Sequence, residues 1–183
     1  MLRFFFTRYL DRFERAWGYD GSYMREVLAA NPWSFLKFSL GSKAADFRAA
    51  PFEAMLAAGL VGTLSEDCGP CTQIGIDMAA ARGANPEVIR AILAGDEAAM
   101  GETAALGWRF ARASLARDMQ ACDPLRDEIV RRWGQKALVA ISLNLMSARM
   151  YPTLKYALGH GKACSKITVA GVAAPIAPLP LAA

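Results

Sequence analysis

The sequence has a single histidine, no long apolar run and almost no strand-like alternation, and these absences exclude several kinds of protein. A transmembrane helix needs about 20 consecutive apolar residues, and the longest mostly apolar runs, 54–64 and 137–148, are shorter. Charged residues interrupt the apolar N-terminus and no small-residue cleavage site follows, so a secretion signal is not indicated. We therefore expect a cytoplasmic protein with no transmembrane segment.

The charges do not favour a nucleic-acid partner. The net charge is +4, and the arginines are interspersed with acidic residues. Nucleic-acid recognition needs a basic face with aromatic stacking positions or a reading motif, and the sequence has neither. A zinc site at Cys68 and Cys71 needs two more ligands, and Cys122, Cys164 and His160 lack the usual paired spacing. We expect no nucleic acid, no metal and no cofactor.

The composition predicts one folded domain of the all-α class. Of the 183 residues, 54% are hydrophobic and 21% are charged, which is typical of a globular protein. Apolar residues recur at helical spacing along most of the chain, and alternation of period two occurs only around 167–172. The pattern predicts helices near 3–16, 22–29, 32–47, 51–64, 69–82, 86–94, 97–119, 124–133 and 135–158.

We divide the chain into an N-terminal amphipathic helix within 1–20, a helical domain over 21–160 and a loose or extended tail over 161–183. The N-terminal helix either docks on the core or a neighbouring subunit, or lies on a membrane surface. Three helix starts share a capping side chain followed by proline, at Asn31-Pro32, Asn85-Pro86 and Asp123-Pro124.

Cys68-Gly69-Pro70-Cys71 is the clearest chemical signal. Two cysteines at this spacing form a small disulfide ring, and the unpaired amides and dipole of a helix start stabilise a thiolate. Glu66 and Asp67 oppose the thiolate unless they are neutral or point away. The motif resembles the thioredoxin active site, but that frame needs a preceding strand, and 52–64 has helical periodicity. The alternative without chemistry is two thiols that only pack in the core.

A thiol site also needs a group that moves protons. Glu53 is the only charged residue between Arg48 and Glu66, so we predict that it is partly buried. If its helix packs beside Cys71, Glu53 can exchange a proton with a sulfur. The other interpretation of Glu53 is a carboxylate placed at a helix N-terminus by the dipole. Glu66 and then Asp77 are the next candidates.

The segment 68–96, CGPCTQIGIDMAAARGANPEVIRAILAGD, resembles the core of the AhpD-like alkylhydroperoxidase and carboxymuconolactone decarboxylase superfamily. The resemblance implies an all-helical bundle that assembles as a trimer or hexamer. It also implies a dithiol that reduces a small peroxide or exchanges with a partner protein's disulfide or dithiol. Cys71 is then the attacking sulfur and Cys68 the resolving one.

The sequence departs from that family at its proton relay. Members that act by this route carry a histidine four residues after the second cysteine and often another between the two, where this chain has Gly75 and Pro70. Their glutamate corresponds to Leu56, one helical turn from Glu53. Two alternatives to a thiol oxidoreductase therefore stay open. One is an oligomeric scaffold or small-ligand-binding protein with Trp33, Phe35 and Trp108 as pocket walls, and the other is a lactone decarboxylase-like enzyme.

Overall fold

A computed structural model describes residues 2–161 and 166–177, and this part of the chain is an all-α fold with one short hairpin. The helices are α1 (Leu2–Trp17), α2 (Ser22–Ala30), α3 (Pro32–Ser42), α4 (Phe52–Ser65), α5 (Gly69–Ala81), α6 (Pro86–Ala94), α7 (Glu97–Leu115), α8 (Met119–Trp133) and α9 (Gln135–Ala157), with a 3-10 turn η1 (Lys43–Asp46). No helix in the described ranges has the length and apolarity to cross a bilayer.

Helix α4 lies at the centre of the main core. It is apolar around its whole circumference, which is typical of a helix buried on all sides, and eight of its residues are buried, from Ala54 to Thr63. Helices α5, α6, α7 and α9 pack around it. Small residues allow close approach: Gly107 of α7 lies against the backbone of Ala54, and Gly62 lies against Ala148 of α9.

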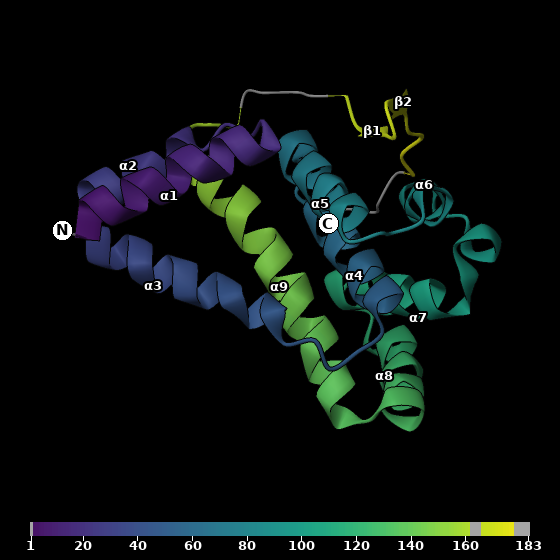
Figure 1. Cartoon of the computed structure of the whole chain (residues 1–183). Coiled ribbons are helices and arrows are strands. Elements are labelled where there is room, and N and C mark those ends of the chain that lie inside the picture. The colour runs from purple at the N-terminus through teal and green to yellow at the C-terminus, as the bar shows by residue number, and fades with distance from the viewer. Residues whose placement is uncertain (1, 162–165, 178–183) are drawn as a thin grey trace.

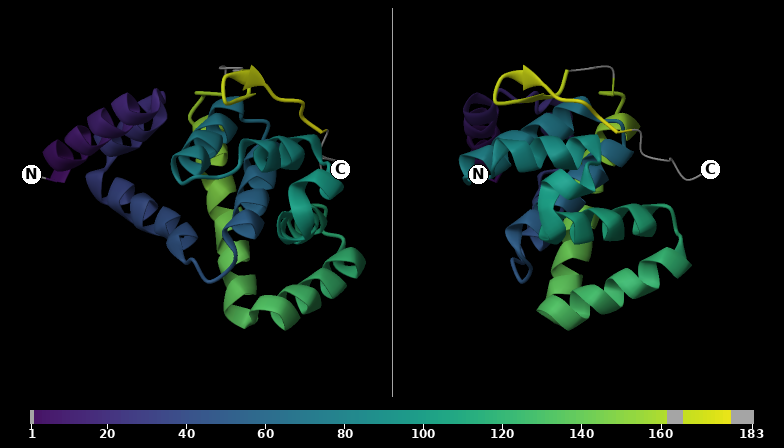
Figure 2. Two further views of the ribbon diagram at one scale, coloured as in Figure 1. Left: turned by 45° about the vertical axis from the view of Figure 1, so that its right-hand side comes forward. Right: turned by 90° about the vertical axis from the view of Figure 1, so that its right-hand side faces the viewer.

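The first three helices and η1 form an arm, residues 2–46, on the opposite side of α9 from most of the core (Figure 1). The arm has its own apolar cluster, which includes Phe6, Leu10, Tyr23 and Phe35. Figure 2 shows the arm projecting from the rest of the molecule. The amphipathic helix predicted over 3–16 is confirmed as α1, but its apolar cluster continues into α2 and α3 rather than ending near residue 20.

Two of the three predicted capping motifs are confirmed. The Asn31 side chain accepts hydrogen bonds from the amides of Trp33 and Ser34, and the Asn85 side chain accepts one from Glu87. The predicted start at Asp123-Pro124 is wrong, because Asp118 caps the helix five residues earlier through the amide of Ala121. Pro124 therefore lies inside α8, where it removes one backbone hydrogen bond.

The described part of the tail is held by side chains rather than loose. Strands β1 (Thr168–Val169) and β2 (Val172–Ala173) form an antiparallel hairpin around Ala170 and Gly171, which both have positive φ, as a type I′ turn requires. The Gln73 side chain accepts from the amide of Thr168 (2.8 Å) and donates to its carbonyl (3.1 Å). Arg90 donates to the carbonyl of Val169. The hairpin therefore covers α5 and α6, as Figure 2 shows.

Candidate functional site

Cys68 and Cys71 form a disulfide across the first turn of α5, with a Cα–Cα distance of 5.3 Å. Cys68 is the N-cap residue and Pro70 lies in the first turn, where its missing amide costs no hydrogen bond. The Thr72 hydroxyl lies 3.1 Å from the Cys68 carbonyl and 3.0 Å from the Thr63 hydroxyl of α4. This buried contact fixes the start of α5 on the core. Both cysteines are 4% exposed, so neither sulfur lies on open surface.

A polar side chain of the arm contacts the disulfide. The Tyr19 hydroxyl lies 3.6 Å from Cys71 Sγ, and it is the donor because a disulfide sulfur carries no hydrogen. Its other neighbour is the Tyr23 hydroxyl at 3.3 Å. Burial raises the pKa of both tyrosines above the ordinary value, so each phenol keeps its proton at neutral pH. The pair can therefore donate a hydrogen bond to a thiolate at Cys71.

A buried lysine lies behind the tyrosines. Lys155 of α9 is 3% exposed, and its Nζ is 5.7 Å from the centroid of the Tyr19 ring. Within the described residues its ammonium forms no hydrogen bond or ion pair, and burial lowers its pKa although the charge of Asp20 opposes the shift. A charged ammonium here stabilises negative charge near Tyr19.

His160 lies just past the end of α9 and contacts the arm. It is half-buried, and its Nε2 lies 2.8 Å from a carboxylate oxygen of Glu26 in the arm. The ring centroid is 6.4 Å from that of Tyr23. The histidine therefore joins the end of α9 to α2, beside the tyrosine pair rather than at the sulfurs.

The structure does not support the predicted role of Glu53. Its side chain is exposed, whereas we predicted partial burial. It also lies at the wrong end of α4, because α4 and α5 run antiparallel: Arg82 stacks on Phe52, and Thr63 contacts Thr72. Glu53 and Thr63 are ten positions apart, which is about 15 Å at a rise of about 1.5 Å per residue. The apolar neighbours in sequence belong to other faces of the helix.

The other two carboxylates are engaged elsewhere. Glu66 precedes Cys68 by two residues, but its carboxylate pairs with Arg149 and accepts from Thr153, both on α9. Asp77 accepts a hydrogen bond from Gln73, the side chain that holds the hairpin. Tyr19 is thus the side chain that contacts the Cys71 sulfur, and Tyr23 and Lys155 lie next to Tyr19. Local sequence patterns gave no signal for any of them.

A cavity of about 830 Å³ separates the arm from α4, α5 and α9, and Cys71 lies on its wall. Cys68 does not line it. Of the three aromatic residues predicted as pocket walls, Phe35 lines the cavity, whereas Trp33 is 66% exposed and Trp108 is buried in the main core. Small molecules can therefore reach the buried Cys71 sulfur through this cavity.

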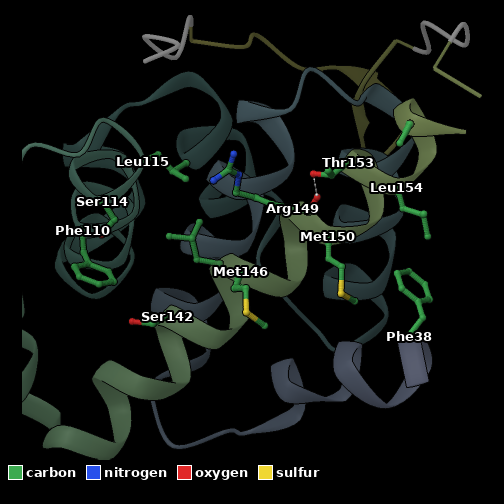
Figure 3. A pocket seen from close by; sticks show the side chains of 12 residues that line it. Phe38, Phe110, Ser114, Leu115, Ser142, Met146, Arg149, Met150, Thr153 and Leu154 are labelled. Carbon is green, nitrogen blue, oxygen red and sulfur yellow. Dashed lines mark hydrogen bonds between the residues drawn. The ribbon is translucent and has the colours of Figure 1, made fainter. Parts of the chain in front are cut away.

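A second, shallower groove of about 810 Å³ follows the outer face of α9. Figure 3 shows Met146, Met150 and Leu154 along it, with Phe110 at one side and Phe38 at the other. Neither cysteine of the disulfide lines this groove. The cavity at Cys71 is therefore the better candidate for chemistry.

No group of three or more histidine, cysteine or carboxylate side chains in the described ranges is placed to hold a metal ion. Cys122 is buried, with the Ser114 hydroxyl 3.4 Å from its sulfur, and Cys164 lies outside the described residues. The thioredoxin frame is absent, because α4 stands where that frame needs a strand. Comparisons with protein-family profiles, with curated proteins and with solved structures give no significant match.

Proposed function

We propose that this chain is a thiol oxidoreductase of the AhpD-like type, in which the Cys68–Cys71 dithiol reduces a peroxide or exchanges with a partner protein's disulfide. One observation carries the proposal: the cysteines are bonded at the start of α5 while Cys71 borders a cavity and accepts a hydrogen bond from Tyr19. The trimer or hexamer implied by the family resemblance and the cytoplasmic location stay predictions.

The proposed reaction balances with the dithiol as the two-electron reductant. The Cys71 thiolate attacks an oxygen of the hydroperoxide, the O–O bond breaks, and the alkoxide leaves as an alcohol after taking a proton. Cys71 becomes a sulfenic acid, which the Cys68 thiol attacks to form the disulfide and release water. A dithiol electron donor, supplied by another protein or a small molecule, then reduces the disulfide.

Tyr19 and Tyr23 take the place of the family's histidines in this scheme. Tyr19 turns its one hydroxyl hydrogen from Tyr23 to the Cys71 thiolate, and the Tyr23 hydroxyl, 3.3 Å away, then donates to Tyr19. The adjacent Lys155 favours the negative charge. Because hydroxyl hydrogens rotate freely, the pair can also pass a proton toward the departing alkoxide.

The proposal is tested with reduced protein and tert-butyl hydroperoxide as the probe. We expect the wild-type chain to consume an equimolar amount of peroxide and to lose two thiols as the Cys68–Cys71 disulfide forms. The double variant Cys68→Ser/Cys71→Ser is the control, because it keeps Cys122 and Cys164. Equal peroxide consumption by the two proteins, measured with a ferric dye assay, would leave only a binding or scaffold function.

Tyr19→Phe tests the new relay. Since a hydrogen bond to a charged group contributes about 1.5–3 kcal/mol, we expect the rate of Cys71 alkylation by iodoacetamide at neutral pH to fall about tenfold or more. The midpoint of the alkylation rate against pH should move upward, because the thiolate loses a donor. Peptide mass spectrometry identifies the modified cysteine.

Tyr9→Phe is the matched control, because Tyr9 is another tyrosine of the arm but is 52% exposed. Its alkylation profile should overlay that of the wild type. An unchanged pH profile in Tyr19→Phe would remove the tyrosines from the mechanism, whatever the effect on stability.

A further inference from the structure

The cavity at Cys71 is elongated, and its two ends differ in chemistry. One stripe of α4, from Phe52 to Thr63, and one stripe of α5, from Cys71 to Arg82, form a continuous wall. Because the helices are antiparallel, Thr63 and Cys71 mark one end and Phe52 and Arg82 the other. Phe52 and Thr63 are eleven positions apart, which corresponds to about 16 Å of helix. The lining between these ends is mainly aromatic and aliphatic.

The far end of the cavity is cationic. Arg82 lines it at the Phe52 end, and Arg48, four residues before Phe52, lines it too. Lys43 is a further basic lining residue, and Asp46 is the only acidic one among the described residues. Arg82 is held over the Phe52 ring, with 4.3 Å between its Cζ and the ring centroid. Within the part of the chain that the structure describes, neither Arg48 nor Arg82 pairs with a carboxylate. This rim therefore complements an anion.

The Cys71 end holds an unused hydroxyl. Ser147 of α9 is 3% exposed and lines the cavity, and its Oγ is the one buried side-chain oxygen or nitrogen in the described residues without a hydrogen-bond partner. Ser142 and Thr153 on the same helix instead donate to the carbonyl four residues earlier. Ser147 precedes Ala148, whose Cβ faces Gly62 next to Thr63. The free hydroxyl is thus near the level of Cys71 along α4.

We propose that this cavity binds a long-chain fatty acid that carries an oxygenated carbon in mid-chain. The carboxylate lies at Arg48 and Arg82, the chain follows the apolar stripes of α4 and α5, and the oxygen reaches the Ser147 hydroxyl beside Cys71. The volume of about 830 Å³ is within the range of ligand pockets, about 300–1,000 Å³. A fatty acid without the mid-chain oxygen leaves the Ser147 hydroxyl without a hydrogen-bond partner, and burying an unpaired hydroxyl costs free energy.

The binding does not depend on redox chemistry, whereas the identity of the substrate rests on the proposed function. If the dithiol reduces peroxides, this site selects fatty-acid hydroperoxides, whose O–O bond then lies beside Cys71. The alcohol product is a hydroxy fatty acid, which the same contacts hold.

The test measures binding to the oxidised full-length protein by isothermal titration calorimetry. Ricinoleate, which carries a mid-chain hydroxyl, is compared with oleate, which lacks it, and with oleyl alcohol, which lacks the carboxylate. Since a neutral hydrogen bond contributes a few-fold to tenfold in affinity and a charged one more, we expect ricinoleate to bind about threefold or more tighter than oleate. Oleyl alcohol should bind about tenfold more weakly than oleate.

Three variants assign the contacts. Ser147→Ala should remove the preference for ricinoleate, and Arg48→Ala/Arg82→Ala should weaken both acids about tenfold. Gly75→Leu should block binding, because Gly75 lines the cavity and a Cβ there meets only the Leu60 methyl at 3.5 Å. Arg109→Ala/Arg131→Ala is the charge-matched control, since these exposed arginines pair with Glu97 and Glu128.

The inference would be overturned if neither ricinoleate nor oleate gave a heat of binding. It would also be overturned if Gly75→Leu and Arg48→Ala/Arg82→Ala both bound the acids with the wild-type affinity. Tighter binding of a diacyl phospholipid than of ricinoleate would also overturn it, because the site is proposed for a single chain. Repeating the titration with Cys68→Ser/Cys71→Ser separates this inference from the proposed function. Binding without peroxide consumption contradicts only the proposed function, and peroxide consumption without binding contradicts only the inference.

Discussion

Replacement of Gly107 by alanine should lower the melting temperature of the protein by about 5–10 °C. A Cβ at this position lies 2.3 Å from the carbonyl oxygen of Ala54 and 2.8 Å from its Cα. These are backbone atoms of the central helix, so no side chain can rotate away, and α4 and α7 must separate. Overpacking of this kind costs about 1–3 kcal/mol, and each kcal/mol shifts the melting temperature of a chain of this size by about 2–4 °C.

Gly75→Ala is the matched control. Gly75 is also in a helix against α4, but its added Cβ meets only a methyl of Leu60 at 3.5 Å, an ordinary contact. Since glycine inside a helix is about 0.5–1 kcal/mol less favourable than alanine, this variant should melt at the same temperature as the wild type or a few degrees higher. Both melts are followed by circular dichroism. A Gly107→Ala protein as stable as the wild type would mean that α4 and α7 do not cross this closely.

The helices could be predicted because their signals are local. Periodic apolar positions and the Asn-Pro caps at Asn31 and Asn85 act within one turn of the chain. The error at Asp123 has the same origin: Asp118 is an equally good cap, and the choice between them depends on which start lets Cys122 and Ile129 enter the core. The hairpin near residue 170 depends on Gln73, almost a hundred residues away, and no local pattern indicates that contact.

The candidate site likewise has a part that local sequence predicts and a part that depends on tertiary contacts. The cysteine pair is a local motif, and its place at the start of α5 was predicted from the residues around it. Tyr19 reaches Cys71 from 52 residues away, because the arm folds back beside α9. Glu53 shows the opposite error: an apolar neighbourhood in sequence does not bury a side chain that its helix turns toward solvent. Proton-transfer groups depend on tertiary contacts, and they could not be predicted from composition or spacing.

Single substitutions of the two cysteines should have very different effects. Cys71 lines the cavity, and the Tyr19 hydroxyl lies 3.6 Å from its sulfur. Cys68 does not line the cavity and has no such contact with Tyr19. We therefore expect reduced Cys71→Ser to react with a hydroperoxide no faster than the double-serine variant. Reduced Cys68→Ser should still react once, at close to the wild-type rate, because the attacking thiolate and its donor are intact.

The product distinguishes the two roles directly. In Cys68→Ser no thiol is adjacent to resolve the sulfenic acid, so it should accumulate at Cys71, where dimedone traps it and mass spectrometry locates the adduct. With a dithiol donor, Cys68→Ser should also form no intramolecular disulfide during turnover. Trapping at Cys122 or Cys164 instead, or equal first-turnover rates for Cys71→Ser and Cys68→Ser, would contradict the assignment of Cys71 as the nucleophile. Adding Tyr19→Phe to Cys68→Ser should slow the same trapping step, because the donor acts on Cys71 before any disulfide forms.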